Sequence, residues 1–221
     1  MAAFPAEGLA FLRALEANND RAWFEANRAV FEGRVRAPML AVVHAIERRL
    51  DAFAPGFAGS LARIHRDLRF SGDKSPYKTQ MTAVFAREGR GRGESAVFRL
   101  RVHGAGAEVA GGLVTPGGAQ LRRLREALAE EHPFVRELVA GLRASMGELR
   151  GELLQRVPKG FRADHPAGDL LRRRQLFFAV DLPAERVTGD RFVDDVAQRF
   201  EALAPLARWI DHELGSRALA A

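Results

Sequence analysis

The chain has 221 residues, of which 47% are hydrophobic and 28% are charged, a balance that is typical of one globular domain. It contains no cysteine, which excludes disulfides and thiolate metal sites. No apolar run approaches the roughly 20 residues that a membrane span needs, and the start lacks the pattern of a secretory signal, so we expect a cytoplasmic protein. The formal charge of +6 permits an acidic partner without requiring one, because 28 acidic residues are interspersed with 34 basic ones.

Residues 1–58 form a predicted helical region. Apolar spacing predicts a helix over 7–17, and Asn19 or Asp20 can cap the next helix. Pro38 is expected to kink or restart that helix, after which the helical spacing continues to Phe53.

Residues 60–114 form a predicted strand-rich core. From Leu61 to Phe70, apolar and polar residues alternate, which predicts a strand. On that strand Arg66 would point with Ile64 and would need a buried acidic partner. Three more strands are predicted over 80–87, 95–103 and 107–114.

Residues 115–221 are predicted to be mainly helical, with one further strand over 175–182. Thr115-Pro116 has the chemistry of a helix start, and Pro133 should break that helix. A short helix is expected over 148–155, and two amphipathic helices close the chain. Strands grouped between helices predict a single α+β domain over 1–221, with an antiparallel meander packed against N-terminal and C-terminal helices.

The stretch 63–79 stands out by its residue types. The chain contains only three lysines, Lys74, Lys78 and Lys159, and the first two flank the sole tyrosine, Tyr77. Lysine is a compact, hydrated point charge, whereas arginine is a planar fork. Two lysines close together in a chain so rich in arginine therefore indicate that this stretch requires the compact charge of lysine. The alternative is that the stretch is a solvated charged loop without a ligand.

The first hypothesis for this stretch is a polar pocket for an anionic small molecule. Arginine forks and lysine charges suit phosphate or carboxylate, and residues 61–79 carry five cations against two aspartates. The residues assigned to this pocket are Asn18, Asn19, Arg21, Arg63, Arg66, Arg69, Asp73, Lys74, Tyr77, Lys78 and Lys159. The alternative is a structural ion-pair network in which Arg66 binds Asp67 or Asp73.

Catalysis is a second hypothesis. His65 and Asp67 lie two residues apart and would share a strand face, so that Asp67 could orient His65 as a general base. Lys74 and Tyr77 are the other catalytic candidates, and a plain His–Asp hydrogen bond is the alternative. The chain has no HExxH spacing, and we assign no metal and no other cofactor.

Nucleic-acid binding is the main non-enzymatic alternative. The basic stretch, the Arg-rich segment 87–92 and Arg172-Arg173-Arg174 would contact the phosphate backbone, although no DNA-binding or RNA-binding motif accompanies them. A non-catalytic scaffold that uses the helical N-terminus is a third class. The sequence leaves the ligand, the reaction and the oligomeric state open.

A series of motifs runs along the chain: Asn18-Asn19 with Arg21 and Trp23-Phe24, the stretch 63–79, Gly111-Gly112, Val157–Phe161 and Asp164-His165-Pro166. The order of these motifs resembles the bacterial and fungal family called domain of unknown function 2461. The resemblance spans nearly the whole chain and implies a single α+β domain. The family has no assigned reaction, so the resemblance supplies no catalytic residue.

Overall fold

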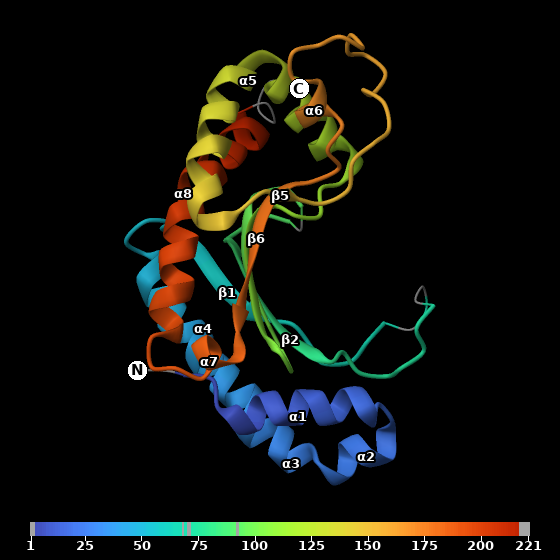
Figure 1. Ribbon diagram of the computed structural model, residues 1–221, viewed down its shortest axis with the longest axis vertical. Helices are drawn as coiled ribbons and strands as arrows, with labels where there is room; N and C mark the ends of the chain where they lie inside the picture. The colour runs from blue at the N-terminus through green and yellow to red at the C-terminus, as the bar shows by residue number, and fades with distance from the viewer. Residues whose placement is uncertain (1–2, 68, 70–71, 92, 217–221) are drawn as a thin grey trace. The chain divides into compact units, whose positions relative to one another are not determined.

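The computed structural model describes residues 3–67, 69, 72–91 and 93–216. In this part of the chain, six strands form one antiparallel sheet in the order β1-β2-β3-β4-β6-β5, which confirms the α+β class (Figure 1). The strands are β1 (Phe57–Leu61), β2 (Gln80–Arg87), β3 (Val97–His103), β4 (Gly106–Leu113), β5 (Leu149–Arg150) and β6 (Leu176–Pro183). The helices are α1 (Ala6–Ala17), α2 (Arg21–Ala26), α3 (Arg28–Val30), the π-helical turn η1 (Phe31–Arg36), α4 (Ala37–Leu50), α5 (Gly118–Met146), α6 (Gly168–Leu171), α7 (Ala184–Val187) and α8 (Phe192–Ser216).

The chain divides into two compact units, each assembled from three segments. Unit 1 takes the described residues of Met1–Phe85, Arg99–Val109 and Asp181–Gln198, and unit 2 takes those of Ala86–Phe98, Ala110–Val180 and Arg199–Ala221. The single domain expected over residues 1–221 stays a prediction.

The helices of unit 1 follow the sequence pattern closely. Asp20 caps α2 as expected, because its carboxylate accepts the Trp23 amide at 2.9 Å. The helix restarts at Ala37, next to Pro38, after the π-helical turn η1. Helix α1 packs closely on η1 at Gly8, where a Cβ would press on the Arg34 carbonyl. The N-terminal helices therefore form one packed layer.

The core of unit 1 lies between α4 and the first two strands. The predicted stripe on α4 is buried and consists of Met39, Val42, Val43, Ile46 and Leu50. Strand β2 has the predicted bounds, and its buried side chains alternate with half-buried ones. Gly59 on β1 permits close packing, since a Cβ there would meet the side chains of Val43 and Phe85.

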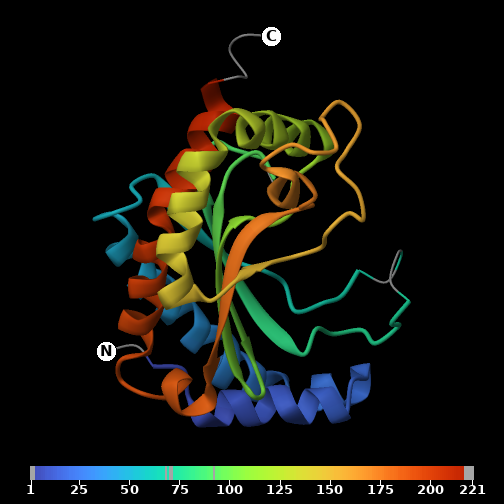
Figure 2. The same cartoon turned by 45° about the horizontal axis from the view of Figure 1, so that its top comes forward.

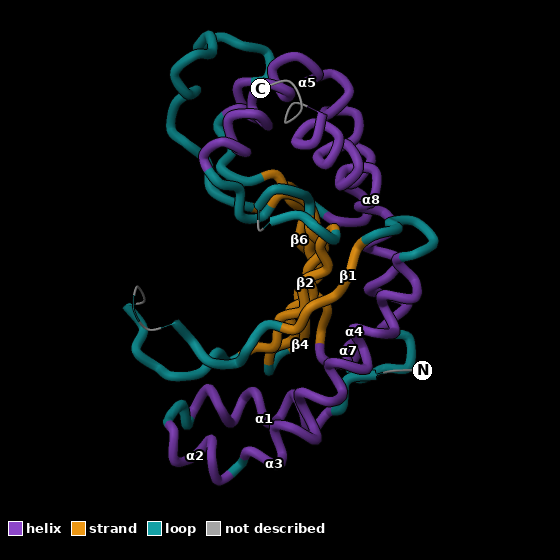
Figure 3. The backbone as a smooth tube through the Cα atoms, turned by 180° about the vertical axis from the view of Figure 1, so that it is seen from behind, coloured by secondary structure: helices purple, strands orange, loops and turns teal. Residues whose placement is uncertain are grey.

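The strand predicted from Leu61 to Phe70 is wrong over the residues that the structure describes. Strand β1 ends at Leu61, and the segment that follows it is loop (Figure 3). Its one described element of sheet structure is an isolated antiparallel bridge between His65 and Tyr77. Leu68 and Phe70 lie outside the described residues. Arg66 is therefore not in strand register with Ile64, and its expected placement on a buried strand face is incorrect.

Unit 2 contains the long helix α5, which begins at Gly118 with Gly117 as its N-cap rather than at the predicted Thr115. The break expected near Pro133 is a kink at Glu131, which has φ −109° and ψ 18°. The Trp209 indole donates to the Glu131 carboxylate at 2.8 Å, so α8 holds this kink in place. Figure 2 shows α5 running beside α8, as does Figure 1.

Two helix predictions in the C-terminal half are wrong. The segment predicted as a helix over 148–155 contains β5, in which Leu149 pairs with Phe178 of β6. The two closing helices are one helix, α8, that continues through Pro205. Buried apolar residues on both sides of Pro205 outweigh the roughly 3 kcal/mol that proline costs inside a helix. Within the described ranges, no helix is long and apolar enough to cross a membrane.

Candidate functional site

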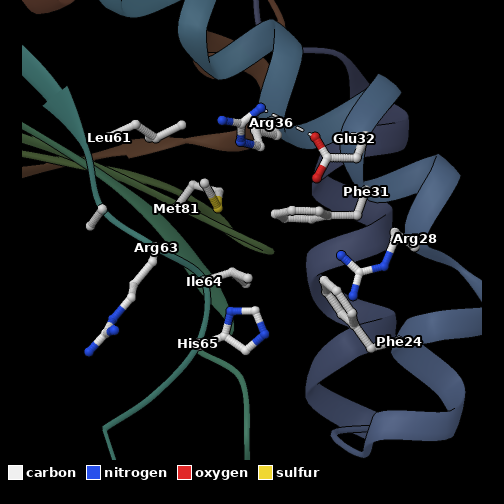
Figure 4. A pocket seen from close by; sticks show the side chains of 11 residues that line it. Phe24, Arg28, Phe31, Glu32, Arg36, Leu61, Arg63, Ile64, His65 and Met81 are labelled. Carbon is white, nitrogen blue, oxygen red and sulfur yellow. Dashed lines mark hydrogen bonds and ion pairs between the residues drawn. The ribbon is translucent and has the colours of Figure 1, made fainter.

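A cavity of about 280 Å³ lies in unit 1, between the N-terminal helices and the segment that follows β1 (Figure 4). Its lining consists of Phe24, Arg28, Phe31, Glu32, Arg36, Leu61, Ala62, Arg63, Ile64, His65 and Met81. Arg63 and His65 come from the stretch singled out in the sequence. The cavity therefore joins the start of that stretch to helical residues that lie about 30 positions earlier.

The helical wall of the cavity is charged. Arg28, Glu32 and Arg36 follow one another at intervals of four residues, and Arg36 lies 3.4 Å from the Glu32 carboxylate. Arg28 lies over the Phe24 ring and bonds to Glu25, which holds the pKa of the Glu25 carboxyl below its usual range. Glu32 and Arg36 lie on the π-helical turn, a rare conformation that is found frequently at functional sites.

The opposite wall is the chain that leaves β1. Figure 4 shows the His65 ring facing Phe24 and Arg28, while the Arg63 guanidinium extends away from the helices. Among the described residues, Arg63 makes no ion pair. Its carbonyl accepts the Lys78 ammonium at 3.0 Å, so Lys78 supports the backbone of this wall.

An aromatic stack supports the cavity. The rings of Phe24 and Tyr77 are stacked with centroids 4.0 Å apart and an interplanar angle of 16°. The His65 ring lies 5.2 Å from Tyr77, and Phe31 lies 5.1 Å from Phe24. Such ring pairs add stability beyond the area that they bury, so the walls are held by a rigid core. Tyr77 is thus buried beneath the cavity and is not among its lining residues.

Asn19 fixes the loop to the helices. Its side-chain amide donates to the Tyr77 carbonyl at 2.9 Å, and its side-chain oxygen accepts the Tyr77 amide at 3.0 Å. One side chain therefore gives Tyr77 the two hydrogen bonds that a neighbouring strand would give. This pair joins segments that lie 58 residues apart.

The two aspartates of the stretch 63–79 form ion pairs with arginines of the same loop. Asp73 lies 3.1 Å from Arg66, and its pKa is held low, first by the Ser75 backbone amide. Asp67 binds Arg69 through both oxygens, at 3.0 and 2.8 Å, and this contact lowers the Asp67 pKa. The Asp67 carboxylate is thus turned to Arg69 rather than to His65, and Asp73 is the Arg66 partner that the network alternative anticipated.

The remaining predicted site residues do not line this cavity. Asn18 donates to the Ala14 carbonyl at the end of α1, and Arg21 is exposed at the start of α2. Lys74 is exposed in the loop, and Lys159 is exposed in unit 2. Their role in ligand binding stays a prediction.

Arg28, Glu32 and Arg36 were not among the site residues predicted from the sequence. The available signal was their spacing of four residues on a predicted helix, which also fits ordinary surface ion pairs. In the part of the chain that the structure describes, no three His, Asp or Glu side chains are grouped to hold a metal ion.

The basic segments proposed for nucleic acid are partly engaged within unit 2. Arg87 binds Asp211 at 2.9 Å, and Arg173 donates to the Leu149 carbonyl at 3.3 Å. Arg174 lies 3.6 Å from Glu152, while Arg92 lies outside the described residues. Arg172-Arg173-Arg174 therefore does not form one exposed basic row.

Comparison with known proteins identifies the family of this chain. No curated protein matches the chain. One family model, described as "Conserved hypothetical protein (DUF2461)", matches residues 7–209, which include both walls of the cavity and the loop beneath it. The chain therefore belongs to the DUF2461 family of conserved hypothetical proteins, as its motifs had indicated.

Proposed function

We propose that unit 1 binds an anionic small molecule, bearing a phosphate or a carboxylate, in the cavity between the N-terminal helices and the chain after β1. The observation that supports this proposal is the charge of the lining. Arg28, Arg36 and Arg63 line the cavity together with one acid, Glu32, so the Arg and Glu side chains of the lining carry a net formal charge of 3 − 1 = +2. Guanidinium groups bind such anions through paired, charge-assisted hydrogen bonds.

The apolar part of the lining favours a ligand with a carbon skeleton. Phe31, Ile64 and Met81 contribute to the same cavity. A volume of about 280 Å³ is about nine times the roughly 30 Å³ that one water occupies in the liquid. The cavity thus has room for an organic anion, with its charged group at the arginines and its apolar part against these side chains.

The test is calorimetric titration of the full chain with phenyl phosphate, compared with phenol as the uncharged probe. We expect phenyl phosphate to bind and the Arg36→Gln variant to bind it about tenfold more weakly, because that variant loses a charged hydrogen-bond donor. Arg34→Gln is the matched control. Arg34 lies on the same π-helical turn, is exposed and does not line the cavity.

The proposal is wrong if phenol binds as well as phenyl phosphate, or if Arg34→Gln weakens binding as much as Arg36→Gln. A single-stranded oligonucleotide tests the nucleic-acid alternative in the same assay. Tight oligonucleotide binding that falls steeply with salt, and that Arg36→Gln leaves unchanged, would support that alternative instead.

A further inference from the structure

Unit 2 contains a separate cavity of about 290 Å³ between α5, α6 and the short strand β5. Three arginines line it, Arg136 and Arg143 from α5 and Arg173 from the segment after α6. Two acids, Asp169 and Glu148, line the same cavity. The cavity therefore carries a net charge of 3 − 2 = +1.

Each of the two helical arginines already has its own carboxylate. Arg136 donates to both oxygens of Asp169, at 3.2 and 2.5 Å, and to the Pro166 carbonyl at 2.7 Å. Arg143 lies 3.1 Å from Glu148. The local charge of these two pairs is therefore balanced.

The remaining positive charge of the cavity lies on Arg173, which is not part of either pair. Within the described part of the chain, its Nη1 donates to two backbone carbonyls and to no carboxylate: to Leu149 at 3.3 Å and to Arg150 at 3.5 Å. Its Nε is buried and has no hydrogen-bond partner among the described residues. Burial lowers the pKa of Arg173, and the negative charges of Asp169 and Glu148 only partly oppose this effect. A half-buried cation without a carboxylate of its own is unfavourable, and an anion in the cavity would relieve that cost.

We propose that this cavity is a second ligand site, which binds an organic carboxylate against Arg173. A monoanion balances the net charge of +1, whereas a dianion would exceed it and would lie close to Asp169 and Glu148. Val139 and Leu170 form an apolar wall that suits the rest of the ligand. This site does not depend on the function proposed for unit 1, because every residue that lines it belongs to unit 2.

The test is calorimetric titration of the full-length Arg36→Gln/Arg63→Gln variant with benzoate, so that the cavity of unit 1 does not contribute. We expect one benzoate per chain, and binding of benzyl alcohol about tenfold weaker because it lacks the charge. Arg173→Gln should weaken benzoate binding about tenfold. Arg122→Gln, an exposed change on the same helix α5 and outside the cavity, should leave binding unchanged.

A second variant keeps the test decisive if Arg173→Gln fails to fold. Ala140 lines the cavity and is exposed on α5, so Ala140→Phe fills the space without changing the core. We expect Ala140→Phe to abolish benzoate binding while the melting temperature stays close to that of the parent. Absence of benzoate binding by the parent variant, or unchanged binding by Ala140→Phe, would overturn the proposal.

Discussion

The hydrogen bonds of Asn19 allow a direct test of what holds the loop beneath the candidate site. Asn19→Ala removes two bonds to the Tyr77 backbone, of 2.9 and 3.0 Å, between segments 58 residues apart. A typical protein hydrogen bond contributes about 1 kcal/mol net, and a buried group left without a partner costs about 1–3 kcal/mol. The Tyr77 amide loses its acceptor, whereas the Tyr77 carbonyl keeps a weak contact with Arg66 at 3.4 Å.

We therefore expect Asn19→Ala to lower the free energy of unfolding by about 2–3 kcal/mol, measured by urea denaturation followed by circular dichroism. Asn18→Ala is the matched control. Asn18 makes one exposed bond to the Ala14 carbonyl, so its loss should cost about 0.5 kcal/mol.

Amide hydrogen exchange locates the effect. In Asn19→Ala the Tyr77 amide should exchange faster than that of Lys78, because Lys78 donates to the Ile64 carbonyl, which the substitution leaves in place. Equal stabilities of the Asn18 and Asn19 variants, or unchanged Tyr77 exchange, would refute the view that Asn19 fixes this loop.

Two further predictions concern packing and pH. Gly8→Ala should destabilise the protein by about 1–3 kcal/mol in thermal melting, because its Cβ would press on the Arg34 carbonyl and the Phe4 ring, whereas Gly33→Ala meets no atom and should stabilise helix η1 by about 0.5–1 kcal/mol. Burial raises the pKa of Asp169, but the hydrogen bonds and charge of Arg136 outweigh it and lower that pKa. Asp169 therefore stabilises the fold above its ordinary pKa and loses this effect as the pH falls through the lowered folded value. At pH 7 the melting temperature of Asp169→Asn should lie below that of the protein without the substitution, and this difference should shrink below about pH 4. A difference that grows on acidification would contradict a stabilising role of ionised Asp169.

Local pattern was sufficient for most regular elements. Strand β2 was predicted at its observed bounds, and β3, β4 and β6 within two residues, because alternate side chains of a sheet face opposite sides. Helices α1 and α4 followed from their apolar stripes in the same way. These patterns reside in neighbouring residues, so a single sequence contains them.

Residue periodicity predicted the wrong secondary structure where contacts between distant segments determine it. The alternation after Leu61 is that of a strand, yet the partner of Tyr77 is the Asn19 side chain rather than a complete strand. Leu149 became a strand residue because Phe178 pairs with it, and α8 passes Pro205 because apolar contacts continue on both sides.

The sequence by itself determined the α+β class and most of the strands and helices, and it singled out the stretch 63–79 as a candidate site. Only the tertiary structure decided which charges surround a cavity. It turned Asp67 towards Arg69 and Asp73 towards Arg66, and it brought Arg28 and Arg36 opposite His65. The physical reason is that secondary structure depends on periodicity between neighbours, whereas a site depends on contacts between segments whose pairing no local period encodes.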